Sequence, residues 1–213
     1  MFFRFQKASC VVVGTFNIHI LHPQWLVSRG IIEKDLEVGI ESNLTRPGLR
    51  LRFPKLGALW SISPDRLVIE TQDAALDCGG TIARVLGILR ETPLFAVGNN
   101  LHCTAEFPGA DGLSERLRQL YQLDGVPPPL KVAQRALHLA VERAENELIN
   151  LQVAVKGEEM EMLGNVHYSL AGSDNPNGAA VAAAQRFFAD RAGAESLAKQ
   201  VWGVSISHDS DHA

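Results

Sequence analysis

The chain has 213 residues, of which 46% are hydrophobic and 21% charged, and its formal net charge is −4. These values predict one large domain or two closely packed small ones, and they exclude disorder over most of the length. The acidic balance disfavours general nucleic-acid binding, because proteins that hold phosphates usually carry a basic excess. No segment reaches the roughly 20 apolar residues of a membrane span. The three cysteines have no C-x-x-C spacing and indicate buried thiols in a reducing compartment, so we expect a cytoplasmic protein.

Residues 1–93 have the pattern of one α+β unit. Val and Ile enrichment predicts a first strand over 8–20, and Pro23 and Gly30 bound a short helix over 24–29. Alternating residues then predict a series of strands over 36–41, 49–53, 58–63 and 66–71. A helix over 81–90 follows from apolar residues at helical spacing.

Residues 94–206 predict a second unit of the same kind. It starts with a strand over 94–107 and an amphipathic helix over 113–123, followed by a stiff connection at Pro127–Pro129. A three-stranded meander is predicted over 131–143, 147–156 and 162–170, although the Ala and Leu content of its first segment also suits a helix. The last element is a long helix over 179–202, which we expect to kink at Gly193. Residues 207–213 form a polar tail that we expect to be disordered.

A short phrase occurs once in each unit and suggests that the chain contains an internal duplication. Val13-Gly14-Thr15-Phe16-Asn17-Ile18-His19 returns, one residue shorter, as Val97-Gly98-Asn99-Asn100-Leu101-His102. Glycines also precede the final helix of each unit, at Gly79-Gly80 and at Gly178. We therefore expect an α+β fold of two similar strand-helix-meander-helix units, with a largely antiparallel sheet and helices packed on one face.

Two resemblances accompany this pattern. The order strand, helix, meander, helix, used twice, resembles the duplicated saddle of the TATA-binding-protein fold, and this analogy concerns topology alone. The segment Trp60-Ser61-Ile62-Ser63-Pro64-Asp65-Arg66-Leu67, with Thr92-Pro93 and Ala96-Val97-Gly98-Asn99-Asn100, resembles a family of uncharacterised prokaryotic proteins. That resemblance covers residues 10–105 and implies a bacterial accessory protein without an assigned activity.

The repeated phrase also supplies the candidate catalytic residues, Asn17, His19, Asn100 and His102. Residues two apart on a strand share a face, so each Asn-His pair would project together, and pairing of the two copies would bring all four side chains together. Two imidazoles and two amides would then suit a small substrate. Alternatively, the four groups satisfy one another and fix the strand register between the repeats.

Other motifs give no diagnostic site, and we predict no cofactor and no metal. His19, His22 and Cys103 lack a carboxylate that would complete a zinc or iron set. The Gly79-Gly80-Thr81 segment lacks the lysine of a phosphate loop and predicts a helix start capped by Thr81. The tail residues His208, Asp209, Asp211 and His212 would chelate only weakly.

Two surface features bear on partners. Phe2, Phe3 and Phe5 precede the expected first strand and need cover, either from the chain's own helices or from a partner subunit. Arg46, Arg50, Arg52 and Lys55 form a local basic patch. The sequence therefore favours a non-catalytic assembly or recognition subunit of a prokaryotic multiprotein complex, with a protein partner or a homo-oligomer. The alternatives are a small-substrate enzyme that uses the Asn/His residues and, third, a nucleic-acid-binding module.

Overall fold

The structure, a computed structural model, describes residues 1–42, 47–109, 112–121 and 134–208. The first half of the chain contains β1 (Phe2–Gly14), α1 (Pro23–Ser28), β2 (Gly39–Ser42), β3 (Leu49–Phe53), the 3-10 turn η1 (Pro54–Leu56), β4 (Ala58–Ser63), β5 (Arg66–Thr71) and α2 (Cys78–Ile88). The second half contains β6 (Leu94–Glu106), α3 (Glu115–Tyr121), β7 (Arg135–Ala144), β8 (Glu147–Lys156), β9 (Glu159–Ser169), α4 (Pro176–Gln185), α5 (Phe187–Trp202) and β10 (Ser205–Ser207). Within these described ranges, no helix is long and apolar enough to cross a bilayer.

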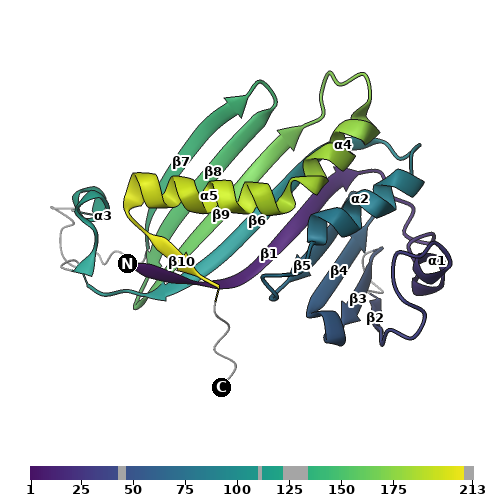
Figure 1. The fold of residues 1–213 in the computed structure, drawn as a ribbon, viewed down its shortest axis with the longest axis horizontal. Coiled ribbons are helices and arrows are strands. Elements are labelled where there is room, and N and C mark those ends of the chain that lie inside the picture. The colour runs from purple at the N-terminus through teal and green to yellow at the C-terminus, as the bar shows by residue number, and fades with distance from the viewer. Residues whose placement is uncertain (43–46, 110–111, 122–133, 209–213) are drawn as a thin grey trace.

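The strands form one ten-stranded sheet, in which nine follow the order β2-β3-β4-β5-β1-β6-β9-β8-β7 (Figure 1). Neighbours along this path are antiparallel, and among the described strands only the short β10 runs parallel to its partner, β1. The two longest strands, β1 and β6, lie side by side at its centre. The expected α+β class with a large, mostly antiparallel sheet is confirmed.

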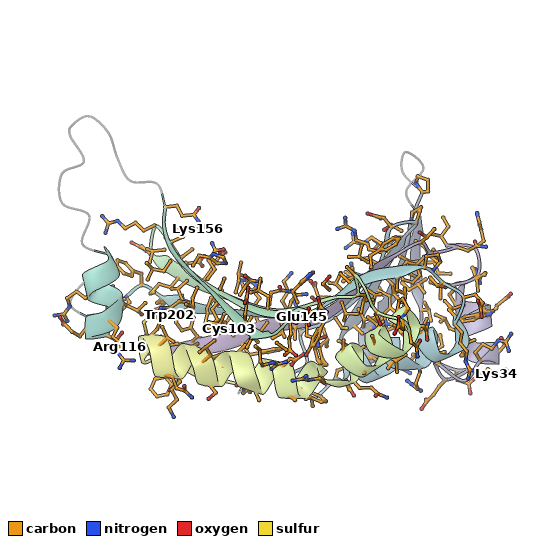
Figure 2. All side chains as sticks on the ribbon, turned by 90° about the horizontal axis from the view of Figure 1, so that it is seen from above. Lys34, Cys103, Arg116, Glu145, Lys156 and Trp202 are labelled. Carbon is orange, nitrogen blue, oxygen red and sulfur yellow. The ribbon has the colours of Figure 1, made fainter. Side chains whose placement is uncertain are left out.

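Helices α2, α4 and α5 cover one face of this sheet, and the core lies between the two layers. Phe3 and Val12 of β1, Leu86 of α2 and Phe187 of α5 are all almost completely buried there. None of the described helices packs on the other face, and the sheet curves so that its ends rise on that side (Figure 2). We call this surface the open face. Its residues alternate along each strand with the buried ones, as expected when one face of a sheet is packed.

Four strands, β3, β4, β5 and β8, have the bounds that the sequence predicts. Their alternation is regular, and turn residues such as Pro64-Asp65 end them sharply. The ambiguous segment before residue 144 is a strand, β7, rather than a helix. The Pro127–Pro129 connection lies outside the described residues.

The prediction for the first strand is wrong in its position, because β1 begins at Phe2 and ends at Gly14. The chain leaves the sheet at its end, where Gly14 donates to Asp65 O and Thr15 donates to Pro93 O. The polar and apolar alternation that suggests a strand as far as residue 20 continues into a loop. In this loop Asn17 Oδ1 accepts a hydrogen bond from the His19 amide, a local turn that competes with strand pairing.

The helix predictions differ from the structure at their ends. The long C-terminal helix is broken at Arg186, which ends α4 and begins α5, and Gly193 lies inside α5. Helix α2 is capped by Asp77, whose side chain accepts from the Gly80 amide, and the expected cap at Thr81 is wrong. Ser207, the first residue of the expected tail, ends β10 and pairs with Arg4, whereas residues 209–213 lie outside the described residues.

Candidate ligand-binding site on the open face

A cavity of about 550 Å³ lies on the open face, over β1, β6, β8 and β9. Its volume falls within the range of small-molecule sites in proteins. The floor of this cavity carries both polar and apolar side chains. The polar ones are three asparagines, a glutamine, a serine and two histidines, one of which comes from the neighbouring β7: Ser9, Asn100, His102, His138, Asn150, Gln152 and Asn165. Leu163, which is 43% exposed, adds apolar surface. Asn100 and His102, which the sequence predicts to share one face of a strand, both lie on this face.

The asparagines form a hydrogen-bonded row across the floor, which we call the amide row. The register of the sheet aligns Ser9, Asn100, Asn165 and Asn150 on four neighbouring strands. Asn150 donates to Asn165 Oδ1 at 3.4 Å, and Asn165 donates to Asn100 Oδ1 at 2.7 Å. Asn100 in turn donates to Ser9 Oγ at 3.1 Å. Each amide has two N–H groups and an oxygen with two lone pairs, so the row keeps hydrogen-bonding capacity for a ligand.

Gly98 provides the space that the amide row needs. A β-carbon at Gly98 would lie 3.1 Å from Asn165 Nδ2, closer than ordinary packing permits. Gly14, the equivalent residue in the other copy of the phrase, serves a different purpose. A β-carbon there would lie 2.6 Å from the carbonyl oxygen of Pro93, where the end of β1 passes the start of β6. Gly98 therefore makes room for a side chain of the amide row, whereas Gly14 makes room for the backbone of the neighbouring strand.

Two ion pairs flank the cavity and neutralise its charged side chains. Lys7 Nζ lies 2.9 Å from Glu70 Oε2 on one side, and Lys156 Nζ lies 2.7 Å from Glu161 Oε2 on the other. Lys156 stands on the side of the sheet away from α5 (Figure 2). Its hydrogen bond lowers the pKa of Glu161, so this carboxylate remains ionised. The charges at the site are therefore balanced locally.

His102 offers an imidazole between these ion pairs. Burial lowers the pKa of His102 below its ordinary value of 6.5, against the opposing effect of Glu161. The ring is therefore mostly neutral at neutral pH, with one nitrogen as donor and the other as acceptor. Within the described ranges, no side-chain hydrogen bond links His102 to a serine, cysteine or carboxylate.

The structure does not bring the two Asn-His pairs together. Gly14 at the end of β1 pairs with Leu94, six positions before Asn100. The two pairs are therefore displaced by about 20 Å or more along the strands. Asn17 and His19 are exposed in the loop after β1 and do not line the cavity. The expected convergence of all four side chains is therefore wrong, and only Asn100 and His102 contribute to this site.

The residues considered for metal binding are also separated. The described part of the chain holds no group of three or more His, Cys, Asp or Glu side chains that could bind a metal ion. His22 caps α1, where its Nδ1 accepts from the Gln24 amide, and His208 contacts Glu195 at 3.1 Å. Cys103 lies buried on the helix side. Asp209, Asp211 and His212 lie outside the described residues.

The two surface features that the sequence offers for partners, the N-terminal phenylalanines and the basic patch, are largely occupied by contacts within the chain. Phe3 is completely buried in the chain's own core, and the Phe5 ring lies 5.7 Å from the guanidinium of Arg191 on α5. Phe2 remains 74% exposed. In the basic patch, Arg50 and Arg52 both lie within 3.7 Å of Glu41, Lys55 is exposed in η1, and Arg46 lies outside the described residues. This pairing reduces the positive potential that phosphate binding would need.

The Gly79-Gly80-Thr81 segment is a packing device. Asp77 already occupies the amide of Gly80 at the start of α2, where a phosphate would bind. A β-carbon at Gly79 would lie 2.0 Å from Ala184 O and 2.5 Å from Phe187 Cβ. Gly79 is therefore required for the close approach of α2 to the junction of α4 and α5.

A second polar cluster lies on the helix side, with a buried carboxylate at its centre and two partly exposed arginines around it. Asp190 of α5 is completely buried and accepts hydrogen bonds from Asn99 Nδ2 at 2.7 Å, Tyr168 Oη at 2.7 Å and Arg143 Nη2 at 2.8 Å. Glu147 contacts both Arg143 and Arg186. Two arginines and two carboxylates compensate one another, so this cluster, which we call the Asp190 network, ties α5 to β6, β7 and β9.

Sequence reasoning missed Asn150, Gln152, Asn165 and His138, and it missed the Asp190 network. The alternation of β8 already placed Asn150 and Gln152 on one face, and this signal alone could have identified them. No known protein-family model matches the chain, and a search of curated proteins found no relative.

Proposed function

We propose that the protein is a non-catalytic recognition subunit that binds a small, uncharged ligand in the cavity on the open face. The observation that carries this proposal is the amide row, in which Asn100, Asn150 and Asn165 present donors and acceptors side by side. A ligand with several hydroxyl or amide groups matches such a floor, because each of those groups also both donates and accepts.

The charges around the cavity favour an uncharged ligand. Lys7 and Lys156 are each held by a carboxylate at less than 3 Å. A charged ligand would have to compete with these ion pairs, whereas a neutral one leaves them in place. The described lining of the cavity has no Phe, Tyr or Trp ring, so the large stacking platforms that usually hold a nucleobase are missing there and the two imidazoles are its only aromatic groups. Neutral polyhydroxyl compounds such as sugars are therefore the class that we expect.

Recognition is favoured over catalysis by the environment of the reactive groups. Ser9, the hydroxyl of the cavity floor, accepts its hydrogen bond from Asn100 rather than donating to a base. The three cysteines are buried on the other side of the sheet, and burial raises the pKa of the Cys78 and Cys103 thiols to about 12. Neither group has the activation that a nucleophile requires.

A thermal-shift screen tests the proposal with a panel of neutral mono- and disaccharides, nucleosides and capped dipeptides. A ligand at ten times its Kd adds about 1.4 kcal/mol of stability, or about 3–6 °C in Tm for a chain of this size. We expect a sugar to give this shift in the natural protein and in the Asn17→Ala and His19→Ala variants. Asn165→Leu, which keeps the side-chain volume but removes the amide, should abolish it.

Three results would contradict the proposal. The first is the absence of any shift with neutral compounds, and the second is a shift that Asn165→Leu retains. Chemical conversion of a bound compound, followed by mass spectrometry, would instead support an enzyme.

We also propose that the fold arose by duplication, as a saddle of two similar units. β1 and β6 have 13 residues each and meet antiparallel at the centre. The meander β3-β4-β5 lies on one side, β7-β8-β9 on the other, and a helical segment follows each meander. Superposition of residues 1–93 on residues 94–206 tests this idea, since duplication requires these elements to coincide after a rotation near 180°.

A further inference from the structure

Along its outer edge, β7 pairs with no other described strand, and it is the longer of the two strands that end the sheet. β7 spans ten residues and is the last strand of the sheet, whereas the opposite edge strand β2 spans four. A long strand edge offers a row of backbone N–H and C=O groups, and soluble proteins usually interrupt or cover such edges. The central segment of β7, Ala136 to Val141, contains no proline and no Lys, Arg, Asp or Glu.

The side chains of β7 add an apolar surface to this edge. Leu137, Leu139 and Val141 point to the helix side and are only half-buried, in contrast to the almost fully buried Ile149, Leu151 and Val153 of the neighbouring β8. Another strand placed against β7 would bury them further. Burial of apolar surface and pairing of backbone groups would then act together.

We propose that a second copy of the chain pairs with β7 in antiparallel orientation, with Ala140 at the two-fold axis, so that two sheets join into one. In a symmetric pair that keeps both helix layers on the same side, residues from the same face of the strand lie opposite each other. The charges then select the register. Centring on Leu139 would place His138 opposite Ala140 and Glu142 opposite Ala136, so neither polar side chain would meet a partner across the axis.

Centring on Ala140 places His138 of one copy opposite Glu142 of the other, and the symmetry repeats this contact. Both side chains are exposed on the open face, and an imidazole N–H can donate to a carboxylate. The same register places Leu139 opposite Val141 on the helix side, where the two apolar side chains cover each other. This pairing does not require the ligand proposed above to be bound, because it uses the edge of the sheet, and His138 is the residue that the interface shares with the cavity lining.

Disulfide trapping tests both the interface and its register. Ala140→Cys places two thiols directly opposite each other, with about 5.5 Å or less between their α-carbons, which a disulfide can bridge. Ala136→Cys is the matched control, since it is also exposed on β7 but would lie about 27 Å from its own copy in this register. The natural cysteines are all buried, so they do not compete under mild oxidation.

We expect the natural protein to be a dimer by light scattering, and Ala140→Cys to cross-link at least about tenfold faster than Ala136→Cys. Ala140→Lys should shift the protein toward monomer, because it places two like charges on the axis. Circular dichroism of each variant checks that it folds. A monomeric natural protein, equal cross-linking of the two cysteine variants, or a dimer unaffected by Ala140→Lys would overturn the proposal.

Discussion

Replacement of Asp190 by asparagine is the most direct test of how the helical layer is held on the sheet. The carboxylate accepts three hydrogen bonds of 2.7–2.8 Å, from Asn99, Tyr168 and Arg143. Asparagine keeps one oxygen and turns an NH₂ group toward a donor, so at least one of these bonds is lost and one contact becomes repulsive. Hydrogen bonds to a charged group contribute about 1.5–3 kcal/mol each.

The expected loss is about 3–5 kcal/mol in the free energy of unfolding, in line with the removal of one partner from a buried ion pair. It stays below the sum of the separate bonds, because Arg143 retains Glu147 and its side chain is 29% exposed to water. The Tm should fall by about 6–20 °C. Urea unfolding followed by circular dichroism measures the effect, and Asp35→Asn, at an exposed loop position, is the control.

A double-mutant cycle sharpens the test. Tyr168→Phe removes one donor to Asp190, and the two substitutions share that hydrogen bond. We therefore expect the combined Asp190→Asn and Tyr168→Phe variant to lose less stability than the sum of the single changes. An Asp190→Asn loss below about 1 kcal/mol, or strict additivity, would refute the view that this network fixes α5 on the sheet.

Three further outcomes follow from the packing and titration of the molecule. Gly79→Ala should destabilise the protein by about 2 kcal/mol or more in urea unfolding, because its β-carbon would overlap Ala184 O. Gly87→Ala should stabilise it by about 0.5–1 kcal/mol, because a β-carbon there would have nothing within 4 Å. The three thiols should not react with Ellman's reagent in the native protein and should all react in denaturant, since they are buried: Cys10, Cys78 and Cys103. The pKa of His102 is lowered in the folded state, so as pH falls the unfolded state binds the proton first. This residue therefore reduces the stability of the protein as pH falls through 6.5 toward the folded pKa. The His102→Gln variant should show a weaker dependence of unfolding on pH over that window.

Local patterns predict most strands of this fold because local physics decides them. β3, β4 and β5 follow a strict alternation that ends at turn residues, and both signals act within a few residues of sequence. The same local patterns do not predict either end of β1. Its start depends on the burial of Phe3 and on the contact of Phe5 with Arg191 of α5, 186 positions later in the sequence. Its end depends on backbone hydrogen bonds with Asp65 and Pro93.

The candidate site shows the same division between local and distant information. Strand geometry correctly predicts that Asn100 and His102 share a face of one strand. It cannot predict that Asn165 lies beside Asn100, because that contact depends on the register between β6 and β9. The repeated phrase misled for a related reason. Gly14 ends its strand, whereas Gly98 lies inside one, so similar letters occupy different structural positions.

The adjacent residues Asn99 and Asn100 connect the two polar clusters of the molecule. Successive side chains of a strand point to opposite faces, so Asn99 enters the Asp190 network while Asn100 enters the amide row. On the helix side the amide is sealed from water, and its hydrogen bonds serve the packing of α5. On the open face the same functional group lies at the floor of a cavity, half-buried and within reach of a ligand. Asn99 therefore contributes to the stability of the fold and Asn100 to the proposed ligand site, although the two residues are adjacent. A change at one of them need not disturb the hydrogen bonds of the other.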